Sequence, residues 1–194
     1  STIQAAAKKH EVDVITSVWE HIPDNPFHEV ICNVKTGNHF NIAYQICSLL
    51  ETARLNMSKR YDTVSFLEHD VLYGEDYFDY EDFKSNVICN HNFIGLCKEG
   101  FQPKGQGDEP LHQLTMKFDF AVEHFKNVLF RSIVAQALLE PTHDPAYTRR
   151  QTIQPSIHVN HGRHFTSHFN IYTKKYFAEH PYWGNYEMLY NKFQ

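Results

Sequence analysis

The sequence contains no apolar run that approaches the roughly 18 to 20 residues needed to cross a bilayer as a helix, although hydrophobic residues fill 42% of its 194 positions. Its first ten residues also lack the apolar stretch of a secretory signal. These two absences argue against a helical membrane protein and lead us to expect a cytoplasmic location. A chain of this length is expected to fold as one domain, residues 1–194, around a single core.

Cysteine is scarce, and the four residues are spread too widely for a disulfide scaffold. Cys32 and Cys89 stand in apolar, strand-like segments, which favours reduced, buried thiols. Cys89, His91 and Cys97 could supply zinc ligands, but no second pair at metal-site spacing completes such a set.

Charge of one sign is missing from two long segments. Residues 61–83 hold eight acids and no Lys or Arg, whereas residues 145–178 hold five bases, four His and no acid. The net charge of -5 argues against a dedicated nucleic-acid-binding protein. One segment suits a cation and the other an anion; the alternative is that they are complementary surfaces that face each other.

Strand and helix patterns alternate in the first half of the chain. Residues 12–19 and 28–34 are β-branched and apolar, as buried strands are. Residues 39–58 follow with a wide apolar helical face, and residues 62–67 with a third strand. A strand, a helix and a strand in this order predict a βαβ unit, and therefore an α/β fold with a mostly parallel central sheet flanked by helices.

The rest of the chain combines a long loop with further strand and helix patterns. Its Gly- and Pro-rich stretch, residues 98–110, predicts a mobile loop that orders over a ligand. The remaining patterns predict strands at 86–89, 92–97 and 156–160, and helices at 117–140 and 185–193.

An acid-x-acid pair follows the third predicted strand, in the stretch Ser65-Phe66-Leu67-Glu68-His69-Asp70. In open parallel sheets, ligands bind beyond the carboxyl ends of the strands, which is where this pair lies. Carboxylate oxygens suit Mg²⁺ or Mn²⁺, ions that hold phosphates through a few carboxylates and waters. The alternative is an acidic turn at the end of a strand.

This layout resembles the GT-A glycosyltransferases, whose DxD motif would here be Glu68-His69-Asp70. The resemblance implies one Rossmann-like domain that binds a nucleoside diphosphate-sugar, such as a UDP-sugar, with Mn²⁺ or Mg²⁺. It implies that Asp70 binds the metal, and that Glu68 contacts the ribose or reaches the metal through water.

A second motif, His158-Val159-Asn160-His161-Gly162-Arg163-His164, lies in the acid-free segment. It is similar to the C-terminal end of many GT-A domains, where a His completes the metal site, and by this resemblance we assign His161 that role. Arg163 and His164 would then lie near the diphosphate, because a guanidinium suits phosphate oxygens. For His158, His164 and His168 the alternative is a surface or packing role, and an all-histidine zinc or iron site also stays open.

Other candidates come from the resemblance and from the acids between the two motifs. Thr16 and Ser17 would face the base of the nucleotide at the end of the first strand. Asn41, at the start of the first long helix, also fits a nucleotide pocket, although helix capping explains it equally. A general base is not obvious; Asp119 is our candidate, on a predicted helix where it shares a face with Glu123.

The predicted reaction is therefore metal-dependent transfer of a sugar from the donor to a hydroxyl acceptor. The acceptor classes left open are a saccharide, a protein and a hydroxymethylated base of phage DNA. A metal-dependent phosphoesterase and a sugar-nucleotide-binding module without catalysis are the alternatives.

Overall fold

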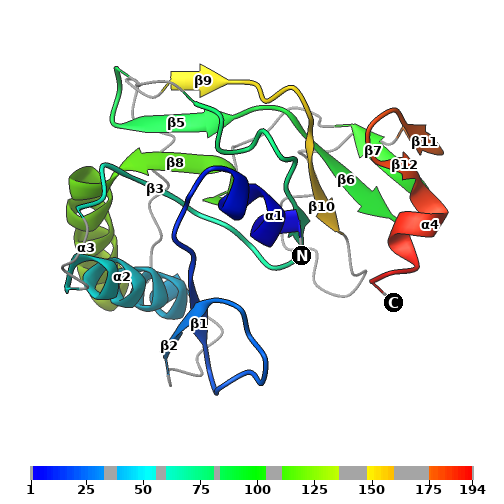
Figure 1. Ribbon diagram of the computed structural model, residues 1–194. Coiled ribbons are helices and arrows are strands. Elements are labelled where there is room, and N and C mark those ends of the chain that lie inside the picture. Colours follow the sequence, from blue (N-terminus) through cyan, green and yellow to red (C-terminus); the bar gives the residue numbers. More distant parts are fainter. Residues whose placement is uncertain are drawn as a thin grey trace.

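The computed structural model describes residues 2–32, 39–55, 60–80, 84–103, 111–135, 148–159 and 175–193. These residues form a mixed α/β structure with two four-stranded sheets, two two-stranded sheets and four α-helices (Figure 1). No helix in these ranges has both the length and the apolar character to cross a membrane.

The first four-stranded sheet has the order β3-β8-β5-β9 and carries two helices. The helices α2 (His39–Leu55) and α3 (Phe118–Ala135) lie side by side in Figure 1. Ala43, Ile46 and Leu50 of α2 are buried at the helical spacing that places them on one face, where they pack in the same core as Phe125 of α3. The strands of this sheet are β3 (Thr63–Ser65), β5 (Val87–Asn90), β8 (Leu114–Lys117) and β9 (Thr148–Arg150).

The second four-stranded sheet has the order β4-β10-β6-β7. All residues of β6 (Phe93–Cys97) are buried, as expected for a strand that is covered on both faces. The helix α4 (Tyr186–Tyr190) packs on this sheet. The other strands are β4 (Val71–Leu72), β7 (Gly100–Pro103) and β10 (Ser156–Val159).

The remaining elements are short. The helix α1 (Thr2–Lys9) packs on Val71 and Tyr73 through Ala6 and Ala7. The parallel pair β1 (Ile15–Val18) and β2 (His28–Ile31) forms a separate sheet. The antiparallel pair β11 (Glu179–His180) and β12 (Gly184–Asn185) precedes α4, and the 3-10 helix η1 (Leu111–Gln113) precedes β8.

The mostly parallel central sheet that the sequence predicts is not confirmed. Among the described strands, five pairings are antiparallel and three are parallel. The expected βαβ unit fails because β3 does not pair with β2; it pairs antiparallel with β8, which follows it by some fifty residues. The side chains of a strand indicate whether it is buried but not which strand it pairs with. Here β3 pairs with a strand that is distant in the sequence.

One predicted loop is partly wrong. Gly100–Pro103, within the Gly- and Pro-rich stretch 98–110, forms strand β7 and pairs with β6. Phe101 anchors it, because this side chain is fully buried in the core and its backbone pairs with Phe177. Residues 104–110 lie outside the described residues.

Two segments run next to each other through both four-stranded sheets. In the first sheet Asn90 of β5 pairs with Arg150 of β9, and in the second Phe93 of β6 pairs with Ser156 of β10, in both cases parallel. Residues 91–92 connect β5 to β6, whereas residues 151–155 connect β9 to β10. The longer connection therefore bulges out from the shorter one, just before β10.

Candidate metal centre

The acid-x-acid pair lies in a tight turn between β3 and β4. The extended chain of β3 continues to Phe66, whose N–H donates to Leu114 O over 3.0 Å. The chain then turns, and Val71 N–H donates back to Glu68 O over 3.3 Å. The pair follows a strand, as predicted, and lies in this turn.

Glu68 and Asp70 meet a histidine of strand β10. Ligand atoms of Glu68, Asp70 and His158 all lie within 4.8 Å of one another. His158 Nε2 is 3.6 Å from Asp70 Oδ2. The pairing of β10 with β4 produces this contact, since His158 is opposite Val71 and Val159 N–H donates to Asp70 O over 2.8 Å.

The electrostatics of the cluster favour an ionised Asp70. Burial of this carboxyl raises its pKa, but the hydrogen bond and charge of His158, with a smaller contribution from His69, outweigh burial and lower the pKa below its ordinary value. About a fifth of the Asp70 side chain and a quarter of that of His158 remain exposed, at 22% and 25%. An ionised carboxylate that solvent and ligands can reach is what a metal ligand requires.

A buried tyrosine supports the turn from inside. Tyr73 is 1% exposed, and its Oη accepts the N–H of Glu68 over 2.9 Å. Its ring packs edge-on against Tyr77, with the ring centroids 4.5 Å apart. Burial raises the pKa of Tyr73 well above its ordinary value, so the phenol stays neutral.

The donor set fits a divalent cation. Adjacent ligands of an octahedral Mg²⁺ bound at about 2.1 Å stand ~3.0 Å apart, and opposite ligands ~4.2 Å. Donor atoms that lie within 4.8 Å of one another therefore have to move closer to share one ion. Rotation of these partly exposed side chains would bring the donor atoms together. Two carboxylates and one imidazole suit Mg²⁺, Mn²⁺ or Zn²⁺.

One histidine of the late motif joins the cluster. His158, which we had considered for a packing role, lies in the cluster. Its neighbours Ile157 and Val159 are buried, so the alternation of the strand turns His158 to the other side. His161 was the predicted ligand; it lies outside the described residues, as do Arg163 and His164.

Asp119 does not join the cluster. Lys117 pairs with Thr63 at the start of β3, whereas Leu114 binds Phe66 beyond its end. Asp119, which follows Lys117 at the start of α3, is therefore near the opposite end of β3 from Glu68.

The predicted nucleotide contacts lie on other elements. Thr16 and Ser17 are partly buried on β1, and Ser17 Oγ has no hydrogen-bond partner among the described residues. Asn41 is buried at the start of α2, where its Oδ1 accepts from Gln45 Nε2 over 3.1 Å. In Figure 1 the pair β1 and β2 stands apart from β10, so the structure does not bring these residues to the cluster.

Two cavities lie away from the cluster. One, of about 520 Å³, is lined by residues of α1, β1 and β2. The other, of about 210 Å³, is lined by residues that include Asp119. Neither is lined by Glu68, Asp70 or His158.

The other metal site considered from the sequence is not formed. Cys89 is fully buried within the apolar core of α2, α3, β5 and β8. No grouping of metal-ligating atoms in the described part of the chain includes Cys89, His91 or Cys97. The buried, free state of Cys32 and Cys89 is confirmed.

No family model, curated protein or solved structure matches the chain.

Proposed function

We propose that the protein is a metal-dependent glycosyltransferase of the GT-A type, which moves a sugar from a nucleoside diphosphate-sugar to a hydroxyl acceptor. The observation that carries the proposal is the meeting of Glu68 and Asp70, the DxD-like pair, with His158 of a late strand. A carboxylate pair that ends a strand and a His from the C-terminal part of the chain are the two components that the resemblance calls for.

Each residue of the centre has a distinct task in this proposal. Asp70, ionised and partly exposed, supplies negative charge to Mn²⁺ or Mg²⁺, and His158 supplies an imidazole nitrogen. Glu68 adds a second carboxylate, directly or through water. A bound divalent ion supplies Lewis-acid stabilisation of the negative charge on a departing diphosphate.

The decisive experiment measures release of nucleoside diphosphate from UDP-sugars in the presence of Mn²⁺, with and without a panel of saccharide, protein and hydroxymethylated-DNA acceptors. Acceptor-dependent release supports glycosyl transfer. Acceptor-independent cleavage to nucleoside monophosphate and sugar 1-phosphate would instead indicate a phosphoesterase, and nucleotide binding without release would indicate a binding module.

Asp70→Asn is the matching variant, because it keeps the shape and removes the charge. Losing one charged metal ligand should slow transfer on the order of a hundredfold or more, on the scale of several kcal/mol. Asp79→Asn is the control, since Asp79 is an exposed acid of the same segment that pairs with Lys9 and His10. Equal activity of the Asp70 variant and the parent protein would contradict the proposal.

A further inference from the structure

Strand β10, which carries His158, follows a bulge formed by residues 151–155. Residues 151–155 connect β9 to β10, whereas only residues 91–92 connect the neighbouring strands β5 and β6. The extra length gives the chain freedom to enter β10 in more than one register. A slip of one residue would turn His158 to the opposite face and present Ile157 or Val159 to Asp70.

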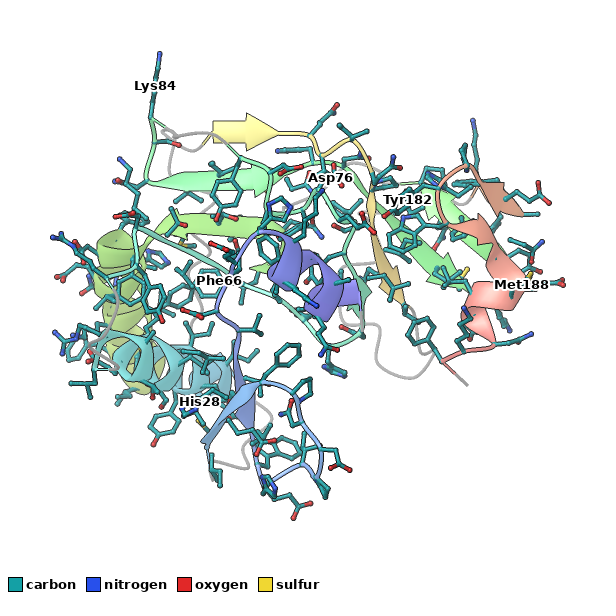
Figure 2. The ribbon with its side chains drawn as sticks, in the orientation of Figure 1. His28, Phe66, Asp76, Lys84, Tyr182 and Met188 are labelled. Atoms are coloured by element: carbon teal, nitrogen blue, oxygen red, sulfur yellow. The ribbon has the colours of Figure 1, made fainter. Side chains whose placement is uncertain are left out.

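The carboxylate of Asp76 holds this bulge. Its Oδ2 accepts two backbone N–H groups, from Ile153 over 2.6 Å and from Gln154 over 3.2 Å. Hydrogen bonds to an ionised acceptor are about twice as strong as neutral ones. Figure 2 shows Asp76 beside the chain that leads into β10.

The glycine at position 74 leaves room for the carboxylate of Asp76 against the bulge. Asp76 Oδ1 is buried and has no hydrogen-bond partner within the described ranges. A Cβ on Gly74 would lie 2.8 Å from that oxygen and 3.0 Å from Gln154 Cβ. Only a glycine at position 74 therefore leaves room for the carboxylate against the bulge.

Two side-chain amides secure the other side of the bulge. Asn90 Oδ1 accepts the N–H of Thr152 over 3.2 Å, and Asn92 Nδ2 donates to Thr152 O over 2.7 Å. Asn90 is fully buried. These bonds tie the bulge to the first sheet, whereas Asp76 ties it to the segment that follows Glu68 and Asp70.

We propose that Asp76 is a positioning residue for the metal centre, which sets the register of β10 and so places His158 beside Asp70. The role rests on the proposed metal site. Asp76 acts through the backbone of residues 153 and 154, which lie five and four residues before His158.

The test is a double-mutant cycle on the binding of Mn²⁺ alone, measured by calorimetry. Asp76→Ala should lower the Mn²⁺ affinity about 10- to 100-fold, the usual effect of removing an outer-shell partner. In a His158→Ala background the same change should cause no further loss, because the misplaced ligand is already gone. Asp76→Asn, which keeps an acceptor oxygen, should restore part of the affinity, and Asp79→Ala should change nothing.

Amide hydrogen exchange of the metal-free protein provides a second, independent test of this role of Asp76. Asp76→Ala should selectively accelerate exchange of Val159 N–H, which donates to Asp70 O. The Phe66 N–H, bonded to Leu114 O in the other sheet, should keep its protection.

Three results would overturn the inference: unchanged Mn²⁺ affinity, an equal loss in both backgrounds, or equal acceleration at Val159 and Phe66. If the parent protein bound no Mn²⁺, the proposed function would fail, and the exchange measurement would still decide whether Asp76 sets the register.

Discussion

At the scale of single residues, the hydroxyl and the ring of Tyr73 have different roles. Tyr73→Phe keeps the ring that packs on Tyr77 and removes the acceptor of the Glu68 N–H. Leaving a partly buried donor without this partner should lower the free energy of unfolding by about 1–2 kcal/mol, as measured by urea denaturation. Mn²⁺ affinity should fall as well, because the turn that carries Glu68 and Asp70 loosens.

Tyr190→Phe is the control for the Tyr73 variant. The ring of Tyr190 packs on the core of the second four-stranded sheet, beside Phe193 and Leu189. Removing its hydroxyl should leave both stability and Mn²⁺ affinity close to those of the parent protein. Equal effects of the two changes would show that Tyr73 contributes packing alone.

Asp70 makes a prediction for pH dependence without metal. Its pKa is lowered by His158 against the opposing effect of burial. A carboxyl whose folded pKa is depressed contributes stability above its unfolded pKa, near 3.9, and this contribution is lost as the pH falls through the folded value.

The free energy of unfolding of the parent protein should therefore decline more steeply below about pH 4 than that of Asp70→Asn. Urea titrations at a series of pH values, with a chelator present, measure the two slopes. Parallel curves would mean that the carboxyl of Asp70 has the same pKa in the folded and unfolded states.

At the scale of elements, the hairpin of β6 and β7 depends on Gly100. This residue has φ +137°, which L side chains rarely adopt, and an added Cβ would lie 2.9 Å from Phe177 O. Gly100→Ala should cost about 1–3 kcal/mol of stability from backbone strain, and more if the bridge between Phe101 and Phe177 breaks.

Gly184→Ala provides the matched comparison for Gly100. Gly184 also has a positive φ, +75°, but a Cβ there would meet no atom within 4 Å. Its substitution should lower the free energy of unfolding by about 1–2 kcal/mol, because it introduces backbone strain but no steric clash. Thermal unfolding of both variants measures the difference, and an equal cost would exclude a steric role for Phe177 O.

At the scale of the whole molecule, metal binding should appear as thermal stability. An ion present at 100 times its dissociation constant adds about 2.7 kcal/mol to the free energy of unfolding. In a protein of this size, that corresponds to a rise in Tm of roughly 5–10 °C. Scanning calorimetry with and without Mn²⁺ measures the rise.

Asp70→Asn and His158→Ala should each abolish most of the rise in Tm, because each removes one of the grouped ligands. Asp79→Ala should keep it. The same rise in all three variants would place the stabilising ion elsewhere on the protein.

Local features of the sequence predicted several elements well. The helix predicted at 39–58 is observed as His39–Leu55, and the strand predicted at 92–97 as Phe93–Cys97. Glu68 and Asp70 stood out because they follow an apolar strand directly. These features are carried by neighbouring side chains, whose periodicity follows from helix and strand geometry.

The tertiary structure decided which strands pair and therefore which residues meet. The sequence by itself determined that Glu68 and Asp70 end a strand and that a strand containing a histidine follows late in the chain. The choice of His158 depends on β10 lying between β4 and β6, in a register set some sixty to ninety residues away along the chain. Pairing of this kind rests on backbone hydrogen bonds that any residue can form, so no local pattern of side chains encodes it.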